Sequence, residues 1–243
     1  HFYRLFFLKG NNFFCPICKF KASKFLPYGK DYEAIKKFKI IGMGFRENAI
    51  CPNCFSKDRE RLSYLFLESL ISKKSINFSS KILHFSPENS LERNFFRKKF
   101  SNYFTADIIK NKSDFVIDLQ NFNFKEKNFD LVICNHVLEH IEDDILALKN
   151  IFSILKPGGI AILQAPVSTI IDIDFKKEGV TSNADRLKFY GQTDHVRIYS
   201  EKNFLQKIKN IGFEFNINEM INEKNNLPSY GLNKMEKVIF ATK

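Results

Sequence analysis

Four cysteines have the spacing of a metal site. Cys15 and Cys18 form the pair "CPIC", and Cys51 and Cys54 form "CPNC" after a 32-residue gap. Each C-x-x-C turn brings two thiolates to the same side, so the four can bind one tetrahedral Zn²⁺ as a structural ion. A thiol redox pair is the alternative, although the thioredoxin-like strand–helix context is missing. The residues in the gap must fold as a small loop or hairpin of their own.

A second pattern, H-x-x-E-H, lies in "NHVLEH" at residues 135–140. On one face of a helix, two such histidines bind the zinc ion of one class of metalloproteases, and the glutamate serves as the base. Here the pattern directly follows an apolar run that reads as a strand, and the next helix is expected only from about Glu142. His136 and His140 would then lie in a turn, so we do not expect a protease site. The remaining cysteine, Cys134, reads as a buried strand residue.

The net charge of +11 is unevenly distributed along the 243 residues. Residues 1–80 hold 15 Lys/Arg against 6 Asp/Glu, whereas residues 81–243 hold 23 against 21. A basic lobe suits an acidic partner such as nucleic acid, a phosphorylated acceptor or a membrane surface, and it can also simply aid solubility. No apolar run approaches the roughly 18 residues of a membrane span. Without a convincing export signal, we expect a cytoplasmic protein.

Hydrophobic periodicity predicts three regions. Residues 1–56 form an irregular, zinc-ribbon-like lobe that carries the four paired cysteines, and residues 57–80 contain a connecting helix. Residues 81–243 alternate between strands and helices, which predicts βαβ units and a mainly parallel sheet covered on both faces. The predicted strands are 81–85, 102–107, 114–119, 129–135, 160–167, 212–218 and 236–242. The predicted helices are 89–100, 142–155 and 201–211. The last two strands follow each other without a helix, which favours an antiparallel pair at one edge.

Residues 129–167, "FDLVICNHVLEHIEDDILALKNIFSILKPGGIAILQAPV", resemble the core of class I S-adenosylmethionine (SAM) dependent methyltransferases. Their order is a strand that starts with Phe-Asp, a turn with "LEH", a helix, "LKPGG" and another strand. "HFSPE" at 84–88 and "GQTDHVRIY" at 191–199 are similar to motifs of a bacterial subgroup that also carries N-terminal C-x-x-C pairs. The resemblance implies a Rossmann-like, doubly wound, seven-stranded sheet with SAM as cofactor.

The resemblance also implies a cofactor site at the carboxyl ends of the strands. Asp107, 21 residues after Ser86, would accept hydrogen bonds from the ribose hydroxyls, and Asp118 would receive the adenine amino group. An N-cap for Asp107 and a turn carboxylate for Asp118 are the alternatives. The family's glycine-rich loop is replaced by "HFSPENS", whose tight turn is expected to face the cofactor. The expected cofactor contacts are Phe85, Ser86, Pro87, Glu88, Asp107, Asp118, Leu119, Asn135 and His136.

Residues 168–199 interrupt the alternating pattern, at a point where methyltransferases commonly carry an insertion that shapes the acceptor pocket. His195 is the expected base, with Asp194 or a nearby acid to orient it. Arg186 or Arg197 would hold an acidic acceptor. A buried ion-pair network that fastens the insertion is the alternative. The expected acceptor contacts are Arg186, Tyr190, Gln192, Arg197 and Tyr199.

These observations predict a SAM-dependent methyltransferase that acts on an oxygen or nitrogen atom of a small-molecule or glycan-like acceptor. The alternative is an RNA methyltransferase, or a non-catalytic nucleic-acid-binding protein that uses the basic zinc lobe. The sequence has neither an aromatic-rich RNA platform nor an "NPPY"-type base-methylation signature, which favours the first hypothesis.

Overall fold

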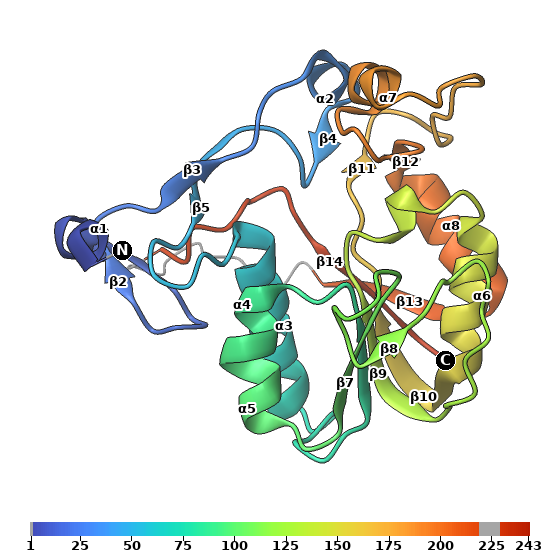
Figure 1. The fold of residues 1–243 in the computed structure, drawn as a ribbon, viewed down its shortest axis with the longest axis horizontal. Helices are drawn as coiled ribbons and strands as arrows, with labels where there is room; N and C mark the ends of the chain where they lie inside the picture. Colours follow the sequence, from blue (N-terminus) through green and yellow to red (C-terminus); the bar gives the residue numbers. More distant parts are fainter. Residues whose placement is uncertain (1, 219–228) are drawn as a thin grey trace.

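The computed structural model in Figure 1 describes residues 2–218 and 229–243. Its centre is a sheet with seven strands among the described residues. Their order is β8 (Phe115–Val116), β7 (Tyr103–Asp107), β6 (Ile82–Phe85), β9 (Phe129–Cys134), β10 (Leu155–Ile162), β14 (Val238–Thr242) and β13 (Glu214–Asn218). Strands β8 to β10 are parallel, and β14 is antiparallel to both of its neighbours. The predictions of a mainly parallel sheet and of an antiparallel pair at one edge are confirmed.

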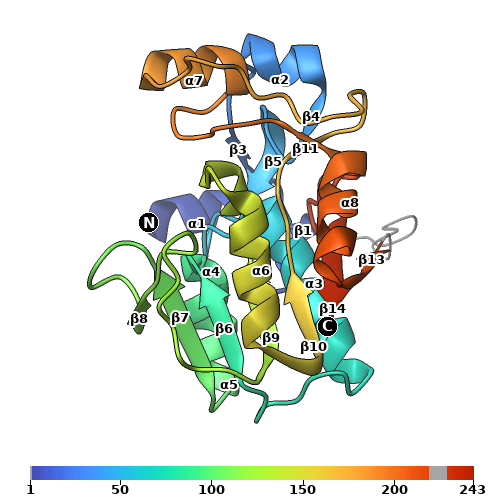
Figure 2. The ribbon, with the colours of Figure 1, turned by 90° about the vertical axis from the view of Figure 1, so that its right-hand side faces the viewer.

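Helices cover both faces of this sheet, as Figure 2 shows. One face packs against α3 (Asp58–Ser72) and the helical segment 89–99, and the other against α6 (Asp144–Ile154) and α8 (Glu201–Ile211). Neighbouring residues of one strand serve opposite faces, because side chains alternate along a strand. Two covered faces explain why β6 and β9 read as nearly continuous apolar runs. None of the helices in the described ranges combines the length and apolar character that a membrane crossing needs.

The N-terminal residues form a separate layer at the carboxyl ends of the strands and beside α3 (Figure 1). It contains two antiparallel pairs, one of β1 (Lys9–Phe14) with β2 (Lys21–Ala22), and one of β3 (Leu26–Tyr28) with β5 (Arg46–Ile50). A short helix, α1 (Phe2–Leu8), precedes β1. The hairpin expected between the two cysteine pairs therefore exists, but it carries an excursion at residues 33–41.

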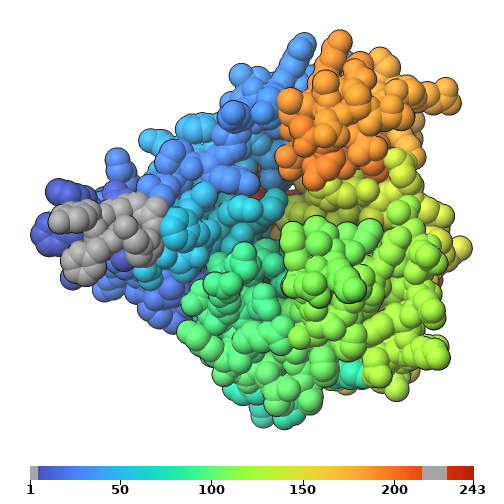
Figure 3. All heavy atoms as spheres, in the orientation of Figure 1, coloured from blue at the N-terminus to red at the C-terminus, as the bar shows by residue number. Residues whose placement is uncertain are grey.

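That excursion reaches across to the insertion. It consists of α2 (Glu33–Phe38) and β4 (Ile40–Ile41). Strand β4 pairs with β11 (Val167–Ser168), which in turn pairs with β12 (Tyr199–Ser200), and α2 packs against α7 (Asn183–Tyr190). The insertion is thus more ordered than the sequence indicated. Figure 3 shows the blue N-terminal residues and the orange insertion meeting above the green α/β domain.

Arg61 fastens this layer to the domain. Its side chain on α3 is fully buried and donates hydrogen bonds to four backbone carbonyls. The acceptors are the carbonyl oxygens of Ala49 (3.0 Å), Ser56 (2.5 Å), Tyr230 (2.7 Å) and Gly231 (2.8 Å). Because a buried guanidinium needs many partners, this arrangement fixes the lobe, α3 and the approach to β14 relative to one another.

Candidate functional site

A cavity of about 520 Å³ opens at the carboxyl ends of β6, β7 and β9, a volume typical of ligand sites. Six of the nine expected cofactor contacts line it: Phe85, Ser86, Asp107, Asp118, Leu119 and His136. It lies where the strand order reverses direction, the position at which doubly wound sheets bind ligands. The structure therefore brings together residues that are up to 51 positions apart in the sequence.

Asp107 and Asp118 stand in similar turns at the edge of this cavity. The Oδ1 atom of Asp107 accepts a hydrogen bond from the backbone N–H of Ile109, and that of Asp118 accepts one from Gln120, both at 2.8 Å. Each bond occupies one carboxylate oxygen while the side chain still lines the cavity. The turn role and a ligand role are thus compatible, because a carboxylate has two oxygens.

Sequence reasoning missed the apolar wall beside Asp107. Ile108 and Ile109 follow this carboxylate, line the cavity, and are 65% and 48% exposed. Large apolar side chains exposed inside a cavity suit a flat ring system. The signal available in the sequence was the pair of isoleucines directly after the acid that ends a strand.

The turn after β6 has the shape usually made by glycine. Ser86 has a φ of 46°, in the left-handed region that non-glycine residues rarely adopt. The Ser86 N–H donates to the carbonyl oxygen of Ala106 on β7 at 2.7 Å, which holds the turn in place. Ser86 therefore adopts a backbone conformation that is usually left to glycine.

Three expected cofactor contacts, Pro87, Glu88 and Asn135, do not line the cavity. The Glu88 carboxylate instead pairs with His84 Nε2 at 2.9 Å and accepts a 3.4 Å hydrogen bond from the Asn135 amide. Burial acts to raise the pKa of Glu88, but the hydrogen bond and charge of His84 prevail and lower it to about 2. Glu88 and Asn135 thus support the turns beneath the cavity.

A second cavity, of about 320 Å³, adjoins the first. His136, His140 and Asp194 line both. The N-terminal lobe and the start of the connecting segment supply much of its wall, including four basic residues: Lys30 and Arg46 of the lobe, and Lys57 and Arg59 of residues 57–80. Of the expected acceptor contacts, Gln192 lines this cavity and Arg186 lines the first one. The lobe's share was not visible in the sequence, because it depends on the excursion docking against the insertion.

His195 and Asp194 do not form the expected base–acid pair. The Asp194 carboxylate lies 3.4 Å from Nδ1 of His140, and the Asp194 carbonyl oxygen lies 3.2 Å from the same atom. His195 lines the second cavity and packs edge-on against His140, with ring centroids 4.8 Å apart. Burial lowers the pKa of His195 to about 4, which leaves a neutral but weakly basic imidazole. Asp194 therefore orients His140 instead.

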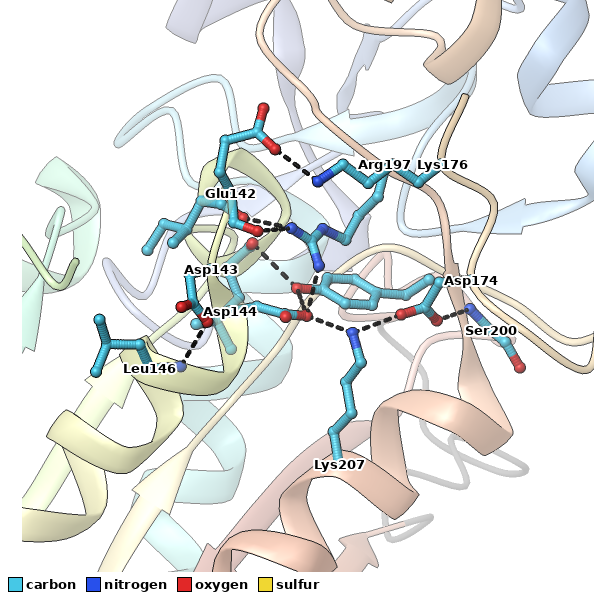
Figure 4. A network of polar contacts seen from close by, with 12 residues as sticks. Glu142, Asp143, Asp144, Leu146, Asp174, Lys176, Arg197, Ser200 and Lys207 are labelled. Carbon is cyan, nitrogen blue, oxygen red and sulfur yellow. Dashed lines mark hydrogen bonds and ion pairs between the residues drawn. The ribbon is translucent and has the colours of Figure 1, made fainter. Parts of the chain in front are cut away.

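Two of the expected acceptor contacts, Arg197 and Tyr199, line neither of these two cavities. Arg197 belongs to the buried network in Figure 4, and the buried Tyr199 joins it through Asp144. A buried network was the alternative interpretation of these residues. Arg197 donates to the carbonyl oxygens of Ile141 (2.7 Å) and Glu142 (2.6 Å) and pairs with Asp144 at 2.8 Å. The Tyr199 hydroxyl also donates to Asp144, at 2.9 Å. The network fastens the insertion to the start of α6.

Tyr190, a third expected acceptor contact, is also buried away from both cavities. Its hydroxyl accepts a hydrogen bond from the backbone N–H of Lys177 at 3.1 Å. Its ring packs with Ile35, Ile40 and Ile198 where the lobe meets the insertion. Tyr190 therefore holds these two segments together.

The four paired cysteines converge in the lobe. The Sγ atoms of Cys15 and Cys54 are 3.6 Å apart and those of Cys18 and Cys51 are 3.7 Å apart. All four sulfur atoms lie within 4.8 Å of one another. A tetrahedral Zn²⁺ with bonds of about 2.3 Å needs sulfur atoms about 3.8 Å apart, so the geometry fits zinc. Cys134 lies apart from this cluster, buried in β9.

The chain matches the profile of a family described as "Methyltransferase domain" over residues 57–217. A ubiquinone biosynthesis O-methyltransferase of Rickettsia typhi is 30% identical over 132 residues, which cover 49% of this chain and 54% of the relative. The chain thus spans about half the length of this curated relative.

Two solved structures are also similar. A SAM dependent methyltransferase from Archaeoglobus fulgidus has a TM-score of 0.47 and 15% identity, covering 76% of this chain and 96% of the other. A methyltransferase from Mesorhizobium loti has a TM-score of 0.47 and 11% identity, covering 72% and 97%.

Proposed function

The chain belongs to the methyltransferase domain family, and we propose on this basis that it transfers a methyl group from SAM to an oxygen or nitrogen atom of a small-molecule or glycan-like acceptor. The observation that carries the proposal is the pair of adjoining cavities that share His136, His140 and Asp194. One cavity would hold the cofactor and the other the acceptor. SAM supplies an already activated methyl group, so the chain mainly has to hold the two molecules in line.

In the first cavity, Asp107 would accept hydrogen bonds from the ribose hydroxyls, and Asp118 would receive the adenine amino group. Ile108 and Leu119, which line the same space, would pack against the adenine ring. The left-handed turn at Ser86 would bring the backbone of this loop toward the methionine part of the cofactor. His136, on the wall shared with the second cavity, would flank the transferred methyl group.

In the second cavity, the basic residues favour an acceptor that carries an acidic group. Arg46 is paired with Asp58 at 2.5 Å, and Lys57 lies 4.0 Å from Glu60. Arg59 has a buried Nε atom that finds no hydrogen-bond partner within the described residues. A phosphate or carboxylate on the acceptor would satisfy this donor, because guanidinium groups bind such anions with two hydrogen bonds.

The four lobe cysteines would bind one structural Zn²⁺. The lobe contributes a wall of the second cavity, so the ion would act on the reaction only by holding that wall in shape. We expect one zinc ion per purified chain and loss of that zinc in Cys18→Ser, as measured by elemental analysis. A chain that is folded and free of zinc would contradict this part of the proposal.

An RNA acceptor is the second candidate, and the four basic residues of the second cavity favour it. Phosphate contacts make nucleic-acid binding fall steeply with salt. Tight RNA binding that weakens about a thousandfold between 50 and 200 mM salt, as about six phosphate contacts predict, would favour RNA. Weak binding with a flat salt response would leave the small-molecule acceptor.

Calorimetric titration of SAM and S-adenosylhomocysteine into the zinc-loaded protein tests the cofactor half of the proposal. We expect the affinity for both molecules to fall at least tenfold in Asp107→Asn, because the variant loses the charged acceptor of the ribose hydroxyls. A tenfold loss corresponds to about 1.4 kcal/mol of binding free energy. Asp172→Asn, on an exposed surface pair with Lys202, is the matched control and should bind as the wild type does. A folded wild-type protein that binds neither molecule would contradict the proposed function.

A further inference from the structure

Glu139, His140 and His195 form a second cluster of metal-ligating side chains. Each offers a ligand atom, and these atoms all lie within 4.8 Å of one another. All three residues line the second cavity, and His140 also lines the first. The cluster therefore stands beside the boundary between the two proposed binding spaces, away from the lobe cysteines.

The carboxylate of Glu139 is buried with an unsatisfied oxygen. The residue is 2% exposed, and its Oε2 atom has no hydrogen-bond partner in the described part of the chain. Its Oε1 atom lies 3.5 Å from Nδ1 of His136. Burying a carboxylate oxygen without a partner costs free energy. A cation at this point would satisfy it.

The local backbone explains how the three ligands meet. Leu138–His140 form a single turn of 3₁₀-helix before α6, with Asp143 as the N-cap. The sequence prediction of a turn here is confirmed, so His136 and His140 are not stacked on a helix face. The N–H of Val196 donates to the carbonyl oxygen of Glu139 at 3.0 Å. This bond holds the insertion beside the turn, so that His195, the residue before Val196, lies close to Glu139 and His140.

His140 is already oriented as metal ligands usually are. Its Nδ1 atom faces two oxygen atoms of Asp194, so this nitrogen is the donor. The Nε2 atom is then the unprotonated one and can bind a metal. Histidine ligands commonly donate their other ring N–H to a carboxylate or carbonyl in this way.

We propose that Glu139, His140 and His195 bind a divalent first-row metal ion, such as Mn²⁺, Fe²⁺ or Zn²⁺, with open coordination positions that face the acceptor. One carboxylate and two imidazoles suit these ions, whereas the four thiolates of the lobe select zinc. Three protein ligands leave room for an oxygen atom of the acceptor, as in catalytic metal sites.

The role of this ion rests on the proposed function, although its binding does not. A bound cation favours the ionised form of a hydroxyl that it contacts. The acceptor hydroxyl would lose its proton to solvent. Its oxygen would then form the bond to the methyl carbon while the carbon–sulfur bond breaks, leaving a neutral thioether. With His195 as a ligand of the ion, the ion would take over the activation of the acceptor that was expected of a His195 base.

Titration of Mn²⁺ into zinc-loaded protein, followed by electron paramagnetic resonance, tests the site. Thiolates bind Mn²⁺ poorly, so the signal reports the second cluster. We expect one Mn²⁺ per chain, with affinity at least tenfold lower in Glu139→Gln and in His195→Gln. Glu142→Gln is the matched control, because Glu142 lies three residues away in an exposed pair with Lys176; it should bind Mn²⁺ normally.

SAM calorimetry on the same variants separates loss of ligands from loss of fold. Variants that keep SAM affinity but lose Mn²⁺ support the site. Wild-type protein that binds SAM but no Mn²⁺, or that binds Mn²⁺ equally well in all variants, overturns it. Mn²⁺ binding without SAM binding would leave this site standing and refute the proposed function.

Discussion

Ser86 and His136 follow neighbouring parallel strands, β6 and β9, have the same left-handed backbone conformation and line the same cavity. Their φ angles are 46° and 54°. The N–H of His136 donates to the carbonyl oxygen of Gln164, and that of Ser86 to the carbonyl oxygen of Ala106, both at 2.7 Å. Strain of this kind gathers at functional sites, where the surrounding structure holds it.

Substitution of Ser86 tests whether the turn needs a left-handed residue. Ser86→Val should lower the free energy of unfolding by about 1–2 kcal/mol, because a branched side chain clashes in this conformation. Ser86→Gly should stay within about 0.5 kcal/mol of wild type, since relief of strain is offset by added freedom in the unfolded chain. Urea unfolding measures both. Equal stability of the two variants would contradict the assigned turn.

Glu236 should make stability depend on pH. Burial, followed by the charge of Asp58, raises its pKa from 4.5 to about 7. The folded state therefore holds this proton more tightly than the unfolded state, and its contribution to stability is lost as pH rises from about 4.5 to 7. The free energy of unfolding of Glu236→Gln should equal that of the wild type near pH 4.5 and should be about 3 kcal/mol higher at pH 8. Urea unfolding at both pH values is the measurement, and a pH-independent difference would refute it.

Tyr199 should affect stability before it affects catalysis. Tyr199→Phe removes the hydroxyl that bonds both Leu138 and Asp144. Loss of these buried bonds should cost about 1–3 kcal/mol. Lys202→Ala, at an exposed surface pair, should cost less than about 0.5 kcal/mol. A Tyr199→Phe protein with wild-type stability but a raised KM for an acceptor would restore the original assignment to acceptor binding.

Removal of zinc should disturb the lobe that lines the second cavity and leave SAM binding in the first cavity nearly unchanged. Cys18→Ser should expose the lobe to proteolysis at residues 10–56, since lobes of this size depend on their metal. SAM affinity should change less than about threefold, because the described residues that line the first cavity come from 85–194. Limited proteolysis and calorimetry measure the two effects. Equal loss of SAM binding would show that the lobe supports the whole domain.

The sheet was predictable because each of its main strands is marked by the residues of that strand alone. Apolar runs identify β6 and β9, and acids that end strands of a parallel sheet meet at one edge, which is why Asp107 and Asp118 were found. β8 was predicted over six residues but has two, Phe115 and Val116. At the edge of a sheet, residues with a high strand propensity can extend beyond the part of the strand that is hydrogen-bonded to its neighbour.

The acceptor side was less predictable because its contacts are between distant segments. Polar residues such as Arg197 and Tyr199 can line a pocket or form a buried network. They form a buried network here because the Asp144 carboxylate, from a distant segment, bonds both side chains. The docking of residues 33–41 against the insertion has no local signature. His195 likewise lies near Glu139 because distant segments meet, as in the hydrogen bond from the N–H of Val196 to the carbonyl oxygen of Glu139.

The buried guanidinium of Arg61 also sets an order of assembly during synthesis. Two of its carbonyl partners, Tyr230 and Gly231, leave the ribosome 169 and 170 residues after it. At about 5–20 residues per second, the nascent chain waits on the order of ten seconds or more before these bonds can form. Until then, of these four carbonyl oxygens only those of Ala49 and Ser56 are present to accept hydrogen bonds from the Arg61 guanidinium. The cysteines can therefore capture their ion early, while locking of the lobe onto the domain waits for the last strand.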